Sequence, residues 1–283
     1  MIDLHTHTTC SDGTLSPKEL MEHARDIGLI SISVTDHDTV DCIKSGAQSA
    51  LKFNVEFIPG VEIASMHNGF ELHILGYYID VENKDLLDFL IKTRQKRAER
   101  NEEMAALFRR EGYDITLDKL KKLSGGPMIS RVHFARLLVE KGYCTDILQA
   151  FDTLLAPGSK THIRRSLNSP EEVIGIIKKA GGVVSLAHPG NYKRLDPNGM
   201  DLLVQELKTY GLDAIEAIYT NHSAEEERRF TSLARKYGLA ITGGSDFHGM
   251  NKPKIRLGSG LGNLNIDYSV LEEIKKIKNQ AFS

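Results

Sequence analysis

Two histidines near the amino terminus, His5 and His7, stand two residues apart directly after the short apolar run Ile2–Leu4. In an extended strand, side chains two residues apart point to the same face, so both imidazoles can reach one metal ion. Asp12 follows in a Ser-Asp-Gly turn and can reach a neighbouring ion. A single His-x-His pair is weak evidence, so the question is whether later strands end in the same way.

Metal-binding residue types recur where later strands are predicted to end. Apolar, strand-like runs lie at 29–34, 55–59, 71–78, 183–186, 214–218 and 240–242. In a barrel of parallel strands the carboxyl ends share one rim, where side chains converge. The side chains expected at this rim are His5, His7, Asp12, Asp36, His37, Glu62, His73, His188, Asp246 and His248.

This set of side chains predicts a hydrolytic metal centre. Neutral imidazoles and carboxylates suit Zn²⁺, Mn²⁺ or Fe²⁺. The set exceeds what one ion can use, whereas two or three ions bridged by a carboxylate would use all of it. A hydroxide bridging such ions is a nucleophile at neutral pH, and the ions stabilise both oxygens of an in-line displacement. Any one of these histidines alone could be a surface or capping group, but six at successive strand ends cannot.

The chain around these residues divides into two kinds of segment. Its 283 residues are 41% hydrophobic and 26% charged, which suits an α/β domain with an insert. Segment 84–165 has no strand-like run and carries 17 basic against 11 acidic residues, whereas the remainder has a net charge of −8. We therefore predict a metal-binding barrel formed by 1–83 and 166–283, with a helical cap inserted at 84–165.

The predicted cap carries basic side chains that could hold a phosphorylated substrate. On a long helix from about 85 to 111, Arg97, Arg100 and Asn101 have the spacing of one helix face. Arg131 and His133 open another helix after Gly125 and Gly126, and free N–H groups at a helix start favour an anion.

Three further side chains need an interpretation. Arg94 is expected on a solvated helix face. His222 follows a strand and could touch substrate. His67 lies in a predicted turn and is expected to face solvent.

The bulk properties exclude several classes of protein. With 36 basic and 38 acidic residues, the overall charge does not indicate a class of binding partner. No apolar run reaches the roughly 20 residues of a membrane span. No secretory signal opens the chain. The three cysteines, Cys10, Cys42 and Cys144, share no metal-ligand spacing and are expected to make no disulfide framework, which favours a reducing cytoplasm.

The ordered motifs resemble those of the polymerase and histidinol phosphatase (PHP) superfamily. The matching segments are His5-Thr-His7, Ser33-Val-Thr-Asp36-His37-Asp38, Gly60-Val-Glu62, His188-Pro-Gly and Gly244-Ser-Asp246-Phe-His248-Gly. The resemblance implies a distorted (β/α)7, TIM-like barrel with a trinuclear metal site and phosphoesterase activity.

The resemblance also implies how the ligands are shared among the ions. One ion would be held by His5, His7, Glu62 and Asp246. Glu62 would bridge to a second ion, completed by His73 and His188, and the third would be held by Asp12, His37 and His248. Some relatives have histidine at the position of Asp12, so the choice among Mn²⁺, Fe²⁺ and Zn²⁺ stays open. Asp36 is expected to orient a ligand histidine, and Ser245 to present ligands rather than to attack.

The cap is similar to that of small stand-alone bacterial members, through Arg97-x-x-Arg100-Asn101 and Arg131-x-His133-Phe-Ala135. Those relatives act on nucleotide 5′-phosphates, 3′,5′-bisphosphates or the 5′ ends of short RNA. We therefore expect a metal-dependent phosphoesterase for nucleotides or short single-stranded RNA, with Glu62, His37, Asp246 and His248 as catalytic ligands.

Three alternatives stay open beside this expectation. They are a histidinol phosphate phosphatase, a non-catalytic phosphate- or metal-binding module, and a helix-turn-helix reader of DNA at residues 130–149. The last is disfavoured because the cap's net charge of +6 is modest and Val132, Phe134 and Leu138 have the spacing of packed residues.

Overall fold

The computed structural model describes residues 1–126 and 128–280. Within them one sheet runs in chain order through β1 (Ile2–Thr6), β2 (Ser31–Val34), β3 (Glu56–His67), β4 (Phe70–Tyr77), β5 (Val183–Leu186), β6 (Ala214–Tyr219) and β7 (Ala240–Gly244). The sheet curls until its two edges meet, where the His7 amide donates to the Phe247 carbonyl at 3.0 Å and the Asp246 amide to the His5 carbonyl at 2.9 Å. The predicted distorted barrel is confirmed.

One strand departs from the expected parallel arrangement. β4 is antiparallel to both β3 and β5, while the other neighbouring strands are parallel. The expectation of parallel strands, nearly all of them ending at the rim in a ligand residue, was therefore wrong for β4, and β3 continues to His67 instead of ending near residue 59. His73 lies in the first half of β4, where the reversed strand direction brings it to the rim.

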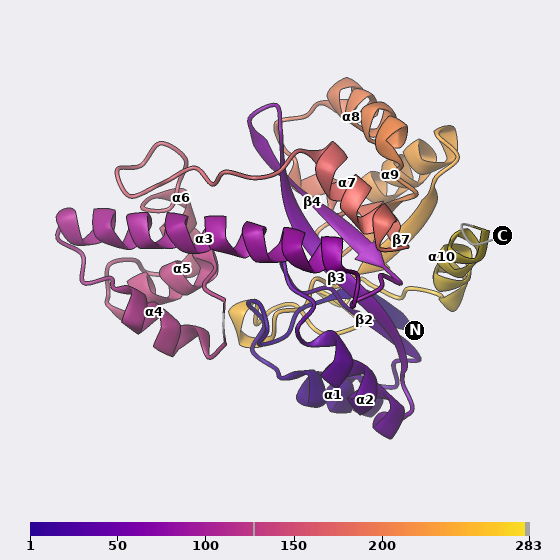
Figure 1. The fold of residues 1–283 in the computed structure, drawn as a ribbon, viewed down its shortest axis with the longest axis horizontal. Coiled ribbons are helices and arrows are strands. Elements are labelled where there is room, and N and C mark those ends of the chain that lie inside the picture. The colour runs from indigo at the N-terminus through magenta and orange to yellow at the C-terminus, as the bar shows by residue number, and fades with distance from the viewer. Residues whose placement is uncertain (127, 281–283) are drawn as a thin grey trace.

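Helices surround the barrel (Figure 1). They are α1 (Pro17–Asp26), α2 (Ile43–Phe53), α7 (Pro170–Lys179), α8 (Pro197–Tyr210), α9 (Ala224–Lys236) and α10 (Tyr268–Gln280), with short 3₁₀ turns η1 (Pro189–Asn191) and η2 (Gly249–Asn251). Their starts follow local signals. At α1, for example, Ser16 and Glu19 form a reciprocal capping box around Pro17.

The inserted segment forms a helical cap beside the barrel. It contains α3 (Lys84–Arg110), α4 (Leu117–Ser124), α5 (Arg131–Glu140) and α6 (Ile147–Asp152). Figure 1 shows α3 running out from the barrel, with α4, α5 and α6 gathered around its far part. Leu86 and Leu90 of α3 pack into the barrel core, whereas Met104 and Phe108 pack into a separate apolar core of the cap.

Two loops that follow β1 and β2 are joined covalently. Cys10 and Cys42 form a disulfide across 32 residues of sequence, and Cys144 is a buried free thiol. The expectation that the cysteines make no disulfide was wrong, because the pairing depends on β1 lying beside β2, which brings the following loops together. Among the described residues, no helix combines the length and apolarity needed to cross a membrane.

Candidate active site

Glu62 lies at the centre of the barrel rim and is fully buried. Five imidazoles surround its carboxylate: those of His5, His7, His37, His73 and His188. The Oε1 atom lies 2.8 Å from His73 Nδ1, and Oε2 lies 2.9 Å from His37 Nδ1. Each carboxylate oxygen thus faces a different group of histidines, which is the arrangement of a bridging ligand.

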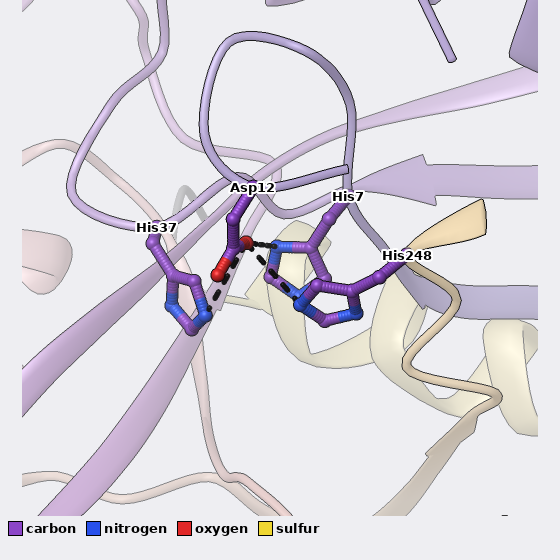
Figure 2. Close-up of side chains that lie close together, drawn as sticks. All are labelled: His7, Asp12, His37 and His248. Atoms are coloured by element: carbon purple, nitrogen blue, oxygen red, sulfur yellow. Dashed lines mark ion pairs between the residues drawn. The ribbon is translucent and has the colours of Figure 1, made fainter. Parts of the chain in front are cut away.

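A second carboxylate, Asp12, collects another group of imidazoles. Its Oδ1 atom lies 3.2 Å from His248 Nε2, 3.8 Å from His37 Nε2 and 3.9 Å from His7 Nδ1. Figure 2 shows the four side chains pointing toward one another, with His37 on one side of Asp12 and His7 and His248 on the other. The Ser-Asp-Gly turn predicted to reach this position does so.

The third carboxylate, Asp246, has one oxygen turned to the histidines and one turned away. Its Oδ1 atom lies 3.3 Å from His7 Nε2. Its Oδ2 atom accepts from the Tyr219 hydroxyl at 2.9 Å and from Lys252 Nζ at 2.6 Å. Sequence reasoning missed Tyr219 and Lys252 as partners of the site, since neither belongs to a metal-binding residue type.

A buried carboxylate outside the predicted set orients two histidines. Glu216, in β6, lies with Oε1 2.9 Å from His5 Nδ1 and accepts from the His188 amide through Oε2 at 2.7 Å. Its sequence signal was available, because Glu216 interrupts the apolar strand Ala214–Ile218. A fully buried glutamate in such a strand indicates a specific partner.

Two of the predicted ligands lie at backbone positions that are strained. His188 and Asp246 have positive φ angles of 29° and 58°, values that non-glycine residues adopt at an energetic cost. Gly244, next to this turn, lets β7 approach β1 closely, because a Cβ atom there would collide with His5. This close approach places Asp246 against His5 of β1 and His7 just after it.

Asp36 does not orient a ligand imidazole as expected. It is buried and accepts hydrogen bonds from the Thr8 amide at 2.7 Å, the Thr8 hydroxyl at 2.5 Å and the Ser11 hydroxyl at 2.5 Å. Its role is to hold the loop between His7 and Asp12. The prediction failed because the oxygens of Asp36 accept hydrogen bonds from Thr8 and Ser11 of this loop instead of from an imidazole.

The rim shifts the pKa values of its imidazoles in opposite directions. Burial lowers the pKa of the His7 imidazole, and the neighbouring His248 and His37 lower it further. Burial disfavours a charge on His73 too, yet Glu62 and Glu71 outweigh it and raise the pKa of His73 to about 10. Metal binding at His73 would therefore release a proton.

The donor set fits several divalent ions. Three groups of predicted ligands at the rim have ligand atoms within 4.8 Å of one another: His7 with Asp12, His37 and His248; His5 with His7 and Asp246; and His37 with Glu62 and His73. Buried atoms without a hydrogen-bond partner include His5 Nε2, His7 Nε2, His37 Nδ1 and Glu62 Oε2. Such orphaned atoms facing one another are what metal coordination would satisfy.

Beside this rim, four arginines gather around two carboxylates. Arg97 of α3 and Arg165 donate to the same oxygen of Asp38, at 2.5 and 2.6 Å. Arg131 of α5 lies 3.9 Å from Glu71. Arg100, which is buried, makes its one described hydrogen bond to the sulfur of Met104.

All four arginines line one cavity of about 1550 Å³ that also contains Asp12, His37, His73 and His248. Arg165 was missed because it stands at the predicted end of the insert, outside any helical pattern.

Other predicted contacts lie elsewhere. Asn101 donates to the Ile129 carbonyl at 2.9 Å, and His133 Nδ1 accepts from the Ser130 amide at 3.0 Å, so both support the segment before Arg131. The structure does not bring His222 to the cavity, because its two ring nitrogens bond the Ala217 carbonyl and the Gly190 amide. His67 was expected to face solvent and is instead buried against Phe70.

The near-closed barrel and its ring of imidazoles and carboxylates define a metal-dependent phosphoesterase. The chain belongs to the PHP domain family, whose model matches residues 3–162. It is 34% identical over 263 residues to the 5′-3′ exoribonuclease Rnm of Escherichia coli, covering 92% of this chain and 88% of that protein. It is 33% identical over 248 residues to the 3′,5′-nucleoside bisphosphate phosphatase of Chromobacterium violaceum, covering 87% of each.

Solved structures agree with this assignment. A Chromobacterium violaceum amidohydrolase with bound sulfate and no metal superposes with a TM-score of 0.87 at 29% identity, covering 99% of this chain and 96% of that one. A protein from Bifidobacterium adolescentis superposes with a TM-score of 0.85 at 30% identity, covering 96% and 94%.

Proposed function

We propose that this protein hydrolyses phosphate esters of nucleotides or of short 5′-phosphorylated oligoribonucleotides that carry a second phosphate. The observation that carries the proposal is the cluster of four arginines beside the metal-binding rim. A substrate with two phosphates can place the reacting one at the rim and the other on the arginines.

The charge of the arginine cluster supports an anionic ligand. Among the described residues, Arg97 and Arg165 pair with Asp38, Arg131 lies near Glu71, and Asp12 adds a more distant negative charge near Arg97. Burial and the adjacent arginines together lower the pKa of Arg100 to about 9. The buried Nε atoms of Arg97, Arg100 and Arg165 have no hydrogen-bond partner. A phosphate group would neutralise this excess charge and accept from these donors.

At the rim, we propose two or three divalent ions, Mn²⁺, Fe²⁺ or Zn²⁺. Their ligands would be His5, His7, Asp12, His37, Glu62, His73, His188, Asp246 and His248. Bound there, such ions activate water and neutralise phosphate oxygens. Glu216, Tyr219 and Lys252 hold ligands in position, and Glu71 accepts from His73 Nε2 at 3.2 Å.

The relatives support nucleotides as the substrate class, since their names include an exoribonuclease and a nucleoside bisphosphate phosphatase. Histidinol phosphate has a single phosphate and would leave the arginine cluster without an anion. We also propose a cytoplasmic location, because phosphorylated nucleosides are substrates of the cell interior. There, thiol reductants would keep Cys10 and Cys42 reduced for part of the time.

The test compares substrates of Mn²⁺-loaded protein side by side. We expect turnover of adenosine 3′,5′-bisphosphate or stepwise release of mononucleotides from a 5′-phosphorylated RNA pentamer. Turnover of histidinol phosphate alone would contradict the proposal. Absence of turnover with metals bound would favour a non-catalytic phosphate-binding module.

Variants test the arginine cluster directly. Arg100→Gln should raise KM for the bisphosphate by about 10- to 100-fold, because it removes a charged hydrogen-bond donor. KM for adenosine 3′-monophosphate, which has no second phosphate, should change little. Arg109→Gln, on the same helix but exposed and outside the cavity, is the matched control.

A further inference from the structure

The cap presents an apolar shelf to the cavity that also contains the metal-binding rim. We use this name for Val139 of α5 and Ile147, Leu148 and Phe151 of α6, all of which line the cavity. Val139, Ile147 and Phe151 pack with their inner faces against the cap core, which makes the shelf rigid. Leu148 is 75% exposed. The other three side chains are half-buried, and a patch of large apolar side chains left partly open to solvent indicates a surface that a ligand covers.

A short chain of contacts connects the shelf to the rim. His73 Nε2 lies 3.2 Å from Glu71 Oε1, and Glu71 Oε2 lies 3.9 Å from Arg131. The guanidinium carbon of Arg131 lies 5.8 Å from the centre of the Phe151 ring, over its face. Glu71 and Arg131 alone therefore separate the shelf from His73 in this chain of contacts, so a ligand on the shelf can belong to a molecule reacting at the rim.

We infer that the shelf binds the nucleobase of the substrate, an inference that rests on the proposed function. With phosphates at the rim and on the arginines, the sugar lies between them and its base must project to one side. The shelf offers a flat aromatic ring, apolar neighbours and the planar guanidinium of Arg131, which are the groups that stack on bases. An alkyl chain would fill the same area but would gain nothing from the guanidinium plane.

The polar groups at the edge of the shelf predict weak discrimination among bases. The Thr145 hydroxyl lies 3.3 Å from Asp146 and 3.1 Å from Gln149, and the Asp146 carboxylate caps α6. Because these groups already have partners, they cannot read the edge of a base in detail. The shelf should therefore accept all four bases and favour purines, which have the larger stacking area.

The experiment measures KM and kcat of the Mn²⁺-loaded protein for two substrates. They are adenosine 3′,5′-bisphosphate and the corresponding bisphosphate of an abasic sugar. The variants are Leu148→Ala, whose exposed side chain can be removed without opening the core, and Phe151→Leu, which keeps apolar volume but removes the aromatic face. Leu51→Ala, at an 84% exposed leucine of α2 outside the cavity, is the matched control.

The wild-type protein should have a KM about 5- to 100-fold lower for the adenosine substrate, the range expected for one stacked base. Phe151→Leu and Leu148→Ala should raise KM for the adenosine substrate and so reduce the difference in KM between the two substrates. KM for the abasic substrate and kcat for both substrates should stay nearly unchanged. Equal KM values of the wild-type protein for the two substrates would overturn the inference, as would variants that impair both substrates alike. Turnover of neither substrate would instead overturn the proposed function, and the role of the shelf with it.

Discussion

Two predicted ligands of the active site are held by side chains outside the predicted ligand set. Asp246 faces histidines through one oxygen, while Tyr219 and Lys252 hold the other. Glu216 supports His5. The positions of these two ligands therefore depend on neighbours that are not themselves predicted ligands.

Asp246→Asn should reduce activity by about 100-fold or more, since even residues that only support metal ligands cost about 10- to 100-fold when replaced. The amide keeps the shape of the side chain but removes the charge that His7 and His5 face. Both kcat and bound metal, measured by elemental analysis, should fall. Ser245→Ala is the neighbouring control, because the Ser245 hydroxyl bonds Asp3 and faces no histidine. Full activity of the Asp246 variant would refute the ligand assignment.

At the scale of elements, α5 depends on a histidine at its start. His133 is buried, and its Nδ1 accepts from the Ser130 amide, the place that a glutamine or glutamate takes in a capping box. Burial lowers the pKa of His133 to about 4. In the unfolded chain, a histidine titrates near its ordinary pKa of about 6.5.

This difference makes the stability of the protein depend on pH. Above about pH 6.5 neither state is protonated at His133, and the full stability is present. As the pH falls toward 4, His133 becomes protonated in the unfolded chain but stays neutral in the folded protein, so the free energy of unfolding decreases. Between about pH 7 and pH 5, the free energy of unfolding of the metal-free wild-type protein should fall by about 2 kcal/mol more than that of His133→Gln. The glutamine keeps the hydrogen bond from the Ser130 amide but does not titrate. Urea unfolding at both pH values measures this difference, and equal losses would contradict it.

The disulfide ties together the loops after β1 and β2, which carry Asp12 and His37. Removing it by Cys42→Ser should lower the free energy of unfolding by about 2 to 4 kcal/mol, because the unfolded chain regains the freedom of a closed loop. Denaturant unfolding without reductant checks the value. Wild-type protein unfolded with reductant should have the same free energy of unfolding as Cys42→Ser. Cys144→Ser unfolded without reductant should not show this decrease.

Element types followed from sequence patterns, but partners between elements did not. The long helix and the strand at 70–77 were visible as helical spacing and as an apolar run. The reversed direction of β4 was missed, although Asn68-Gly69 between the two apolar runs is a two-residue turn typical of an antiparallel hairpin. The expectations for Asp36 and for the Cys10–Cys42 pair failed because each depends on which loops become neighbours.

For the whole molecule, the rim brings together buried ligand atoms that have no hydrogen-bond partner, among them His5 Nε2, His7 Nε2 and Glu62 Oε2. Chelation should abolish activity, and adding Mn²⁺ back should restore it. Loaded protein should also unfold at a temperature about 5 to 10 °C higher, as expected for a ligand at roughly 100 times its dissociation constant. Arg100→Gln should show the same metal-dependent shift as the wild-type protein, because its side chain lies outside the rim. A melting temperature independent of metal would contradict the proposed ligand set.

The architecture of the whole molecule was largely predictable because metal-binding residue types recur at regular places along the sequence. Histidines and carboxylates recur at the ends of most strands, so the rim could be recognised without knowing how the sheet closes. The cavity between barrel and cap could not be predicted from the sequence. Arg165 and Phe151 line the same cavity as the rim only because the cap packs on the barrel in this way.

The insert joins the barrel along one pair of antiparallel helices, α3 and α7. At the start of α3, Asn83 donates to the Lys179 carbonyl at the end of α7, and farther along α3 Lys96 donates to Asn168, just before α7 begins. Because both joins of the insert pack along this one helix pair, the cap can be lengthened, shortened or exchanged without rethreading the sheet. Descendants of one ancestral hydrolase could in this way acquire new substrates while inheriting the same reaction, because selection on the cap leaves the barrel's ligands untouched.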